Sequence, residues 1–210
     1  MIHTKQYFQR EIEIAGRPLL VEGPVEPEQL AALRFDEGLK AFRPPDQQQI
    51  ALVGIAGLPE GRIIIVRDED LVLGYVTFLH PDPLERWSQA KMDDLLELGA
   101  IEVSAKVRAG GVAKKLLHVA FLDDAMEDYI VITTEYYWHW DLKGTGLDVW
   151  EYRKVMEKVM GSAGLVWMAT DDPEICSHPA NCLMARIGSR VRPESIAAFD
   201  AIRFQNRFFY

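Results

Sequence analysis

The chain has little cysteine and no long apolar run. Only Cys176 and Cys182 occur in 210 residues, which is too few for a disulfide framework and suits a reducing compartment. No stretch of about 18 consecutive apolar residues occurs, and the first ten residues are mixed and polar, so we expect neither a membrane span nor a signal peptide. We therefore expect a cytoplasmic protein without disulfides.

The chain is also short of basic residues. It has 23 Lys and Arg against 32 Asp and Glu, a formal net charge of -9. Such a surface repels the phosphates of nucleic acids and anionic lipids. We expect no nucleic-acid partner and no membrane partner. The 49% of hydrophobic residues is enough to fill the core of one compact domain.

Apolar periodicity and breaker residues divide the chain into strands and helices. The clearest feature is a hairpin, with strands at 62–67 and Leu71–Leu79 joined by an acidic turn. A strand at Leu95–Val103 then leads through a glycine turn into a helix that ends near Met126. The other expected elements are strands at 18–21, 129–134 and 165–170, helices at 27–35, 46–56 (capped by Asp46) and 147–160, and a last helix or helix–strand pair at 193–204.

The glycine turn, Arg-Ala-Gly-Gly-Val-Ala at 108–113, is the motif that points to a ligand. A glycine turn entering a helix presents unpaired N–H groups and the positive end of the helix dipole, which together bind pyrophosphate. Gly111 would let the backbone approach the ligand, and Arg108 and Lys114 would add positive charge. A glycine pair before a helix is also a common connection without a ligand, so the surrounding elements have to decide.

The spacing Arg108-x-x-Gly111-x-Ala113 resembles the acetyl-CoA signature of the GNAT superfamily, Gln/Arg-x-x-Gly-x-Gly/Ala. As in that family, a strand ending Ile-Glu-Val precedes the turn, and a hairpin containing Leu-Gly-Tyr-Val lies upstream. The resemblance implies an α/β (α+β) GNAT fold, a mixed central sheet flanked by helices. It places the N-acetyltransferase domain at 18–170 and a C-terminal extension, which packs on the domain or contacts a partner, at 171–210. A Rossmann fold, which needs alternating βαβ units, does not suit the antiparallel hairpin.

The same resemblance implies acetyl-CoA as the co-substrate and no metal. The backbone of the motif strand would bind the acetyl carbonyl and the pantetheine amides. A Cys-x-His-x-x-x-Cys run at 176–182 offers three metal ligands without a fourth, so we expect no zinc site. The implied cofactor-binding residues are Ile101, Val103, Arg108, Ala109, Gly110, Gly111, Val112, Ala113 and Lys114.

Acetyl transfer to an amine requires a deprotonated amine, and lysine has a pKa of about 10.4. A carboxylate beside the acceptor is the expected base. In GNAT relatives the base often lies on the motif strand eleven positions before the Arg of the signature, which here is Glu97. Glu102 lies six positions before it. Strict alternation places the two on opposite faces, whereas one bulge would bring them together, so both remain candidates.

Many GNAT enzymes also use a tyrosine, on the helix after the fifth strand, to protonate the leaving thiolate. Here Met156-Glu-Lys-Val resembles the family's Tyr-Glu-Lys-Leu with Met in place of Tyr, and Tyr152 lies one turn away as a candidate. An alternative alignment over 177–188 puts Met184 at the acid's position. A thiol with a pKa of about 8.5 leaves readily as thiolate, so catalysis does not require this acid.

Several segments resemble one branch of the superfamily, the acetoin-utilisation acetyltransferases. That resemblance implies a protein lysine acetyltransferase that acetylates and inactivates acetyl-CoA synthetase. The alternatives are an acetyltransferase for small amines and a CoA-sensing binding protein. An aromatic run at 136–140 either lines an acceptor groove or covers the core, and a tail at 203–210 docks back or meets a partner. The segments are 42–45, 75–77, 81–87, 133–150, 171–179 and 203–207.

Overall fold

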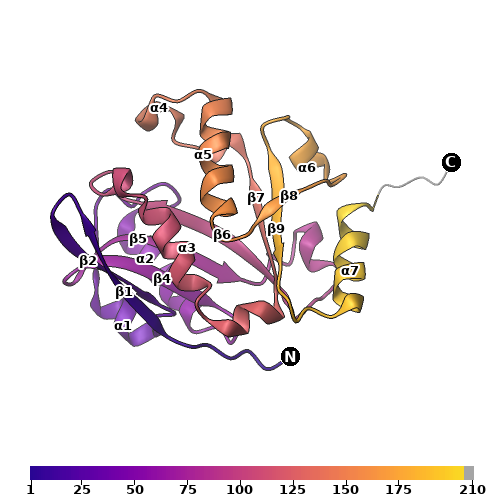
Figure 1. Cartoon of the computed structure of the whole chain (residues 1–210), viewed down its shortest axis with the longest axis horizontal. Coiled ribbons are helices and arrows are strands. Elements are labelled where there is room, and N and C mark those ends of the chain that lie inside the picture. The colour runs from indigo at the N-terminus through magenta and orange to yellow at the C-terminus, as the bar shows by residue number, and fades with distance from the viewer. Residues whose placement is uncertain (206–210) are drawn as a thin grey trace. The chain divides into compact units, whose positions relative to one another are not determined.

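The computed structural model describes residues 1–205, which divide into two compact units (Figure 1). The first unit comprises residues 1–79 and 98–126, and the second comprises 80–97 and the chain from 127 onward. Strand β6, Leu95–Val103, contributes its first three residues to the second unit and the rest to the first. The side chain of Ala109 and tail residues 206–210 lie outside the described part, so the predictions made for them stay predictions.

The first unit is built on an antiparallel sheet. Its strands pair in the order β1, β2, β4, β5 and β6, while β3 pairs in parallel with the start of β5. The predicted hairpin and the predicted strand at 18–21 are confirmed, whereas β1 was not predicted. The bounds are β1 Phe8–Ile14, β2 Arg17–Gly23, β3 Arg34–Phe35, β4 Arg62–Asp68 and β5 Leu71–Leu79.

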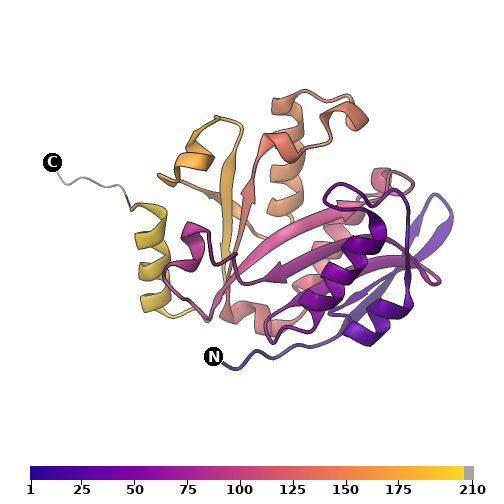
Figure 2. The same cartoon turned by 180° about the vertical axis from the view of Figure 1, so that it is seen from behind.

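Helices cover both faces of this sheet. Figure 2 shows α1 and α2 on one face, and α3 lies on the other, in front in Figure 1. Strand β4 is buried on both sides, because Ile63 and Ile65 join the core beneath α1 and α2 while Ile64 points the opposite way. The helices are α1 Pro27–Ala32, α2 Pro45–Ala56 and α3 Val112–Ala120.

Three predicted helix details in this unit are wrong. Helix α1 ends at Ala32, because the Arg34 N–H then bonds to the Asp70 carbonyl and starts β3. Pro44, not Asp46, is the N-cap of α2, without a side-chain hydrogen bond. Helix α3 stops at Ala120 rather than near Met126, since Asp123 begins a separate 3₁₀ turn, η3 Asp124–Asp128, by accepting the Met126 N–H.

The second unit contains a mixed sheet in the order β6, β7, β9 and β8. The first residues of β6 run parallel to β7, and the other pairs are antiparallel. Trp87, Phe199 and Ile202 fill a core against β7 and β9, so helix α7 is a structural part of this unit. The bounds are β7 Ile130–Glu135, β8 Val166–Met168, β9 Cys182–Ile187, η1 Arg86–Ser88, η4 Tyr137–His139, α4 Leu142–Thr145, α5 Val149–Gly161, α6 Pro173–Cys176 and α7 Pro193–Arg203.

Strand β9 was not predicted, and it lies between β7 and β8. The alternative alignment that made 177–188 a helix with Met184 at the acid's position is therefore wrong, because Met184 lies on this strand opposite Thr133. The predicted elements at 129–134, 147–160, 165–170 and 193–204 are confirmed with shifted ends. The mixed α/β fold class is confirmed, and the boundary at residue 170 stays a prediction. Among the described helices, none is both long and apolar enough to cross a bilayer.

Candidate active site

The glycine turn of the first unit has the backbone of an anion-binding helix start. Gly111 is the N-cap of α3 in the left-handed conformation, with φ 66° and ψ 26°, and no side chain caps the helix. The first N–H groups of an α-helix have no carbonyl one turn back within the helix to bond with. The first backbone bonds of α3 run from the Lys114 and Lys115 N–H groups to the Gly111 carbonyl, at 3.1 and 3.3 Å. A helix start without a side-chain cap suits phosphate binding.

Gly110 and Gly111 are glycines for different structural reasons. A Cβ on Gly110 would lie 2.2 Å from the Ile14 Cδ1 of strand β1, so Gly110 permits close packing within the unit. A Cβ on Gly111 would meet no neighbouring atom, so Gly111 is required for its positive φ and not for lack of space. The open side of the turn at Gly111 leaves room for the ligand that the sequence predicts there. Arg108 and Lys114 are exposed and supply positive charge there.

The motif strand lies tightly against β5 within the first unit. A Cβ on Gly74 would lie 2.9 Å from the Glu102 carbonyl oxygen and 3.3 Å from the Val103 Cα. The predicted glycine of the hairpin thus lets the two backbones pack closely. Ile101 and Val103, the residues expected to bind the acetyl and pantetheine groups, are half-buried on the same strand.

Glu102 is buried, and both of its carboxylate oxygens are occupied. Its Oε1 accepts the Ala41 N–H at 2.8 Å, and its Oε2 accepts the Tyr75 hydroxyl at 2.7 Å. Burial, followed by the Glu102 hydrogen bond, raises the pKa of Tyr75 above its usual range. Glu102 therefore connects the loop before α2 to the middle of β5 and the end of β6.

Glu97 lies in a different environment in the second unit. Its Oε1 accepts a hydrogen bond of 3.2 Å from the Thr134 hydroxyl on β7. Burial raises the pKa of Glu97 to about 7, and the nearby carboxylates of Glu85 and Asp82 also raise it. The hydrogen bond from Thr134 lowers this pKa but does not cancel the shift. A carboxylate with such a pKa is half ionised near neutrality and can accept a proton from an amine.

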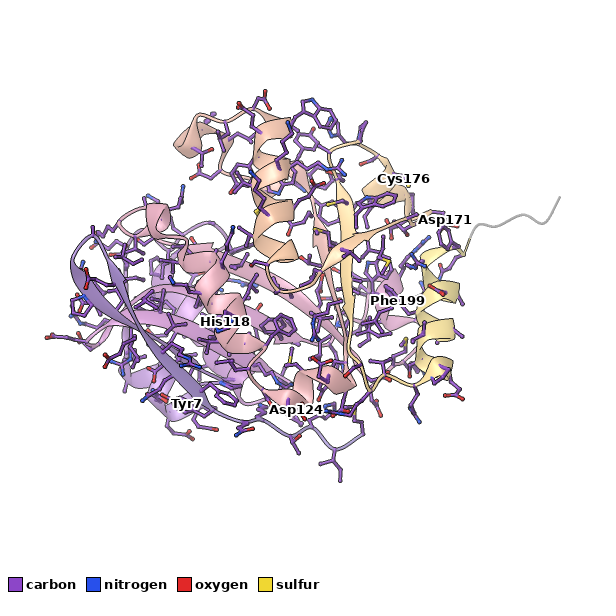
Figure 3. All side chains as sticks on the ribbon, viewed as in Figure 1. Tyr7, His118, Asp124, Asp171, Cys176 and Phe199 are labelled. Atoms are coloured by element: carbon purple, nitrogen blue, oxygen red, sulfur yellow. The ribbon has the colours of Figure 1, made fainter. Side chains whose placement is uncertain are left out.

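Further acidic groups lie around Tyr136, which follows β7. Burial, then the carboxylates of Glu174, Asp172 and Glu85, raise the pKa of Tyr136. Asp172 is neutralised by Arg86, whose Nε lies 3.2 Å away. Arg86 also pairs with Asp171 at 2.6 Å, and Figure 3 labels Asp171 beside α6.

Glu85 and Glu174 differ from Asp172, because neither has an ion pair among residues 1–205. Burial and the carboxylates of Asp82 and Glu174 raise the pKa of Glu85. The surroundings of Glu97 therefore have excess negative charge. Sequence reasoning did not single out Thr134, Glu85 or Glu174, although both glutamates lie in segments that resembled the acetoin-utilisation branch.

Tyr152, the candidate acid, lies half-buried on α5. Its ring stacks on Trp140 with centroids 5.2 Å apart and an interplanar angle of 17°. The Trp140 indole N–H in turn donates to Glu135 at 3.2 Å. This arrangement fixes the ring of Tyr152, and its role as an acid stays a prediction.

The Cys-x-His-x-x-x-Cys run does not assemble as a metal site. Cys176 is exposed near the end of α6 (Figure 3), whereas Cys182 is buried on β9. His178 accepts the Ala180 N–H through Nδ1 and packs against Tyr137, with ring centroids 4.2 Å apart. In the part of the chain that the structure describes, no three His, Cys, Asp or Glu side chains are grouped as ligands.

The chain is similar over its whole length to curated acetoin utilization proteins. It is 62% identical to "Acetoin utilization protein AcuA" of Bacillus subtilis (strain 168) and 60% identical to that of Bacillus licheniformis, each over 210 residues and 100% of both chains. A crystal structure of an acetoin utilization protein from Exiguobacterium sibiricum 255-15 matches with a TM-score of 0.95 at 58% identity, over 98% of this chain and 97% of that one. No protein-family model matches the sequence.

More distant structures show the fold alone. The GNAT domain of S. lividans PAT matches with a TM-score of 0.51 at 14% identity, over 85% of this chain and 96% of that one. A GNAT-family acetyltransferase from Streptococcus pneumoniae matches with a TM-score of 0.52 at 12% identity, over 80% and 98%. The predicted GNAT fold is thus confirmed.

Proposed function

The chain belongs to the AcuA family of acetoin utilization proteins, and from this premise we propose that it is an acetyl-CoA-dependent N-acetyltransferase whose acceptor is a protein lysine. The observation that supports this most is Glu97, a half-buried carboxylate that accepts a hydrogen bond from the Thr134 hydroxyl and whose pKa burial raises to about 7. Such a carboxylate is partly ionised near neutral pH and can take a proton from an ammonium group.

The first unit would bind the donor. The N–H groups at the start of α3 would hold the pyrophosphate, and the exposed side chains of Arg108 and Lys114 would add charge. The backbone of Ile101 and Val103 would hold the pantetheine amides and polarise the thioester carbonyl. The pyrophosphate fits beside Gly111, because this side of the turn is open and carries no Cβ.

Glu97 would accept the proton of the acceptor. The lysine amine, once deprotonated, attacks the thioester carbonyl carbon, a C–N bond forms and the C–S bond breaks. The products are acetyl-lysine and CoA, which leaves as thiolate or takes a proton from Tyr152. Glu102 is less suited to this task than Glu97, since its two oxygens already accept hydrogen bonds.

We propose acetyl-CoA synthetase as the protein acceptor, which acetylation would inactivate. The proposal rests on the resemblance to the acetoin-utilisation branch, and the acidic surroundings of Glu97 are compatible with a cationic acceptor. Incubating the protein with acetyl-CoA and acetyl-CoA synthetase, and then locating acetyl-lysine by mass spectrometry, tests it directly. We expect label on one lysine and loss of synthetase activity.

Two other functions give different results in the same assay. An acetyltransferase for small amines would turn over polyamines or amino acids and leave the synthetase unlabelled. A CoA-sensing binding protein would bind CoA and its partner without transferring label to either class of acceptor. Unlabelled synthetase would therefore contradict the acceptor proposed here.

A further inference from the structure

Five rings form a continuous aromatic surface in the second unit: Tyr136, Tyr137, Trp138, Trp150 and His178. They come from three segments, namely the end of β7 with η4, the start of α5 and the loop before β9. Tyr136 stacks on Trp138 with centroids 4.8 Å apart, and Tyr137 lies edge-on to Trp138 at 5.4 Å. His178 then links Tyr137, at 4.2 Å, to Trp150, at 6.3 Å.

This surface is open to solvent where its tryptophans lie. Trp138 is 46% exposed and Trp150 is 51% exposed, although each is a large apolar side chain that would normally be buried. Adjacent exposed aromatic rings are typical of interfaces, where Trp and Tyr supply most of the binding energy. Covering the core, one of the two roles expected for the aromatic run, does not account for rings that are half in water.

Negative charge borders the surface at Glu174. The Asn181 side chain joins the two, because its Oδ1 accepts the Tyr137 N–H at 3.0 Å and its amide NH₂ donates to the Glu174 carbonyl at 3.3 Å. After burial, the carboxylates of Glu174, Asp172 and Glu85 also raise the pKa of Tyr136. Arg86 neutralises Asp172, but among the described residues no cation pairs with Glu85 or Glu174. An aromatic face beside unpaired carboxylates is the environment that binds Arg or Lys side chains, through cation–π contacts and ion pairs. Two copies of this acidic face would repel each other, which argues against a second copy as the occupant.

The surface also lies near the proposed base. The Thr134 hydroxyl donates to Glu97, and Tyr136, the first ring of the surface, follows Thr134 by two residues. An extended segment advances by about 3.3 Å per residue, so a basic side chain a few residues from a lysine at Glu97 would be within reach of these rings.

We propose that the aromatic surface binds a basic segment of the protein acceptor, holding an Arg or Lys side chain close in sequence to the acetylated lysine between Trp138 and Glu174. This inference rests on the proposed function, because it assumes that the acceptor lysine is delivered to Glu97. It adds that the preferred acceptor has a second cationic side chain near the lysine.

Binding of two peptides tests the surface without requiring turnover. One short peptide has a central lysine flanked by arginines, and in the other glutamines replace the arginines. By isothermal titration we expect the arginine peptide to bind more tightly, and both Trp138→Ala and Glu174→Gln to weaken it by about threefold to tenfold, as lost cation–π and ion-pair contacts would. The glutamine peptide should bind equally to all variants.

Matched controls come from the same unit. Trp167 is 56% exposed on β8 outside the aromatic surface, and Glu194 is an exposed glutamate in the first turn of α7. Trp167→Ala and Glu194→Gln should leave the affinity for the arginine peptide unchanged. If these controls weaken binding as much as Trp138→Ala and Glu174→Gln, the contacts are nonspecific and the inference is wrong.

Kinetics separate this inference from the proposed function. If both peptides are acetylated with the same KM by wild type and by Trp138→Ala, the inference fails and the proposed function stands. If no lysine is acetylated but arginine-peptide binding still depends on Trp138, the surface stands and the function fails. If spermidine is acetylated and competes with the arginine peptide in a Trp138-dependent way, the occupant is a small polyamine, and the inference of a protein segment is wrong.

Discussion

Two carboxylates of strand β6, Glu102 in the first unit and Glu97 in the second, have different surroundings. In the first unit, Glu102 accepts two hydrogen bonds, and Asp123 lies beside the buried guanidinium of Arg62. In the second unit, Glu97 has one hydroxyl partner, and burial together with the nearby carboxylates raises its pKa. A carboxylate that accepts hydrogen bonds on both oxygens or lies beside a cation stabilises a fold, whereas a half-buried carboxylate among other carboxylates keeps its affinity for a proton. The comparison therefore assigns a structural role to Glu102 and Asp123 and proton transfer to Glu97.

The largest expected effect separates Glu97 from Glu102. Because a base must be ionised, kcat/KM of the wild type should rise with pH and level off above about 7, the pKa to which Glu97 is raised. Glu97→Gln should lower kcat by about 10²–10⁴-fold and remove that rise. Values of kcat and kcat/KM measured over a range of lysine-acceptor concentrations at each pH check both effects.

Glu102→Gln is the matched variant on the same strand. Its amide oxygen can still accept the Ala41 N–H, and its NH₂ group can donate to the Tyr75 hydroxyl. We expect a small loss of rate and an unchanged pH profile. If Glu102→Gln abolishes the pH dependence while Glu97→Gln preserves it, the roles assigned to the two units are exchanged.

The next largest effect concerns stability in the first unit. The side chains of Arg62 and Asp123 are 1% and 3% exposed, and the Asp123 carboxylate also accepts the N–H groups of Gln6 and Ala125. Asp123→Ala would leave a buried guanidinium without its carboxylate, so we expect the free energy of unfolding to fall by about 3–5 kcal/mol. Urea denaturation measures the loss.

An exposed pair in the same unit is the control. Arg17 and Asp68 are ion-paired with side chains 48% and 26% exposed. Asp68→Ala should change the free energy of unfolding by about 0–1 kcal/mol, since water screens such pairs. Equal losses in Asp68→Ala and Asp123→Ala would show that burial does not distinguish the two pairs.

How far the sequence predicts this molecule depends on how local each feature is. The hairpin, β6 and the glycine turn follow from neighbouring residues and were predicted. Strand β9 was missed because Cys182–Ile187 is a short mixed segment flanked by polar residues, and only pairing with both β7 and β8 makes it a strand. Local pattern alone does not contain that pairing.

The candidate site divides in the same way. Spacing from the signature identified Glu97 and Glu102, but their difference depends on partners far away in sequence. Glu102 is held by Ala41 and Tyr75, which are 61 and 27 positions away, and Glu97 by Thr134, 37 positions away. The partners become visible only when the strands are placed beside one another.

The smallest expected effect tests whether buried carboxylates of the second unit retain protons generally. Burial raises the pKa of Glu135 to about 7, against the hydrogen bonds from Trp140 and Thr133. Below about pH 4.5 the Glu135 carboxyl is protonated in both the folded and the unfolded state. Between about pH 4.5 and 7 it ionises only in the unfolded chain, so the free energy of unfolding falls as pH rises. Above about pH 7 it is ionised in both states and the free energy levels off. The Glu135→Gln side chain stays neutral and can still accept the hydrogen bond from Trp140. At pH 8 this variant should therefore be more stable than wild type by about 2–3 kcal/mol, and at pH 4 the two should be equally stable.

Thermal unfolding at both pH values, with Glu194→Gln as an exposed control, measures the difference in stability between variant and wild type. A stability gain that is the same at pH 4 and pH 8 would mean that Glu135 is ionised in the fold, and that its unit holds buried charge as the first unit does.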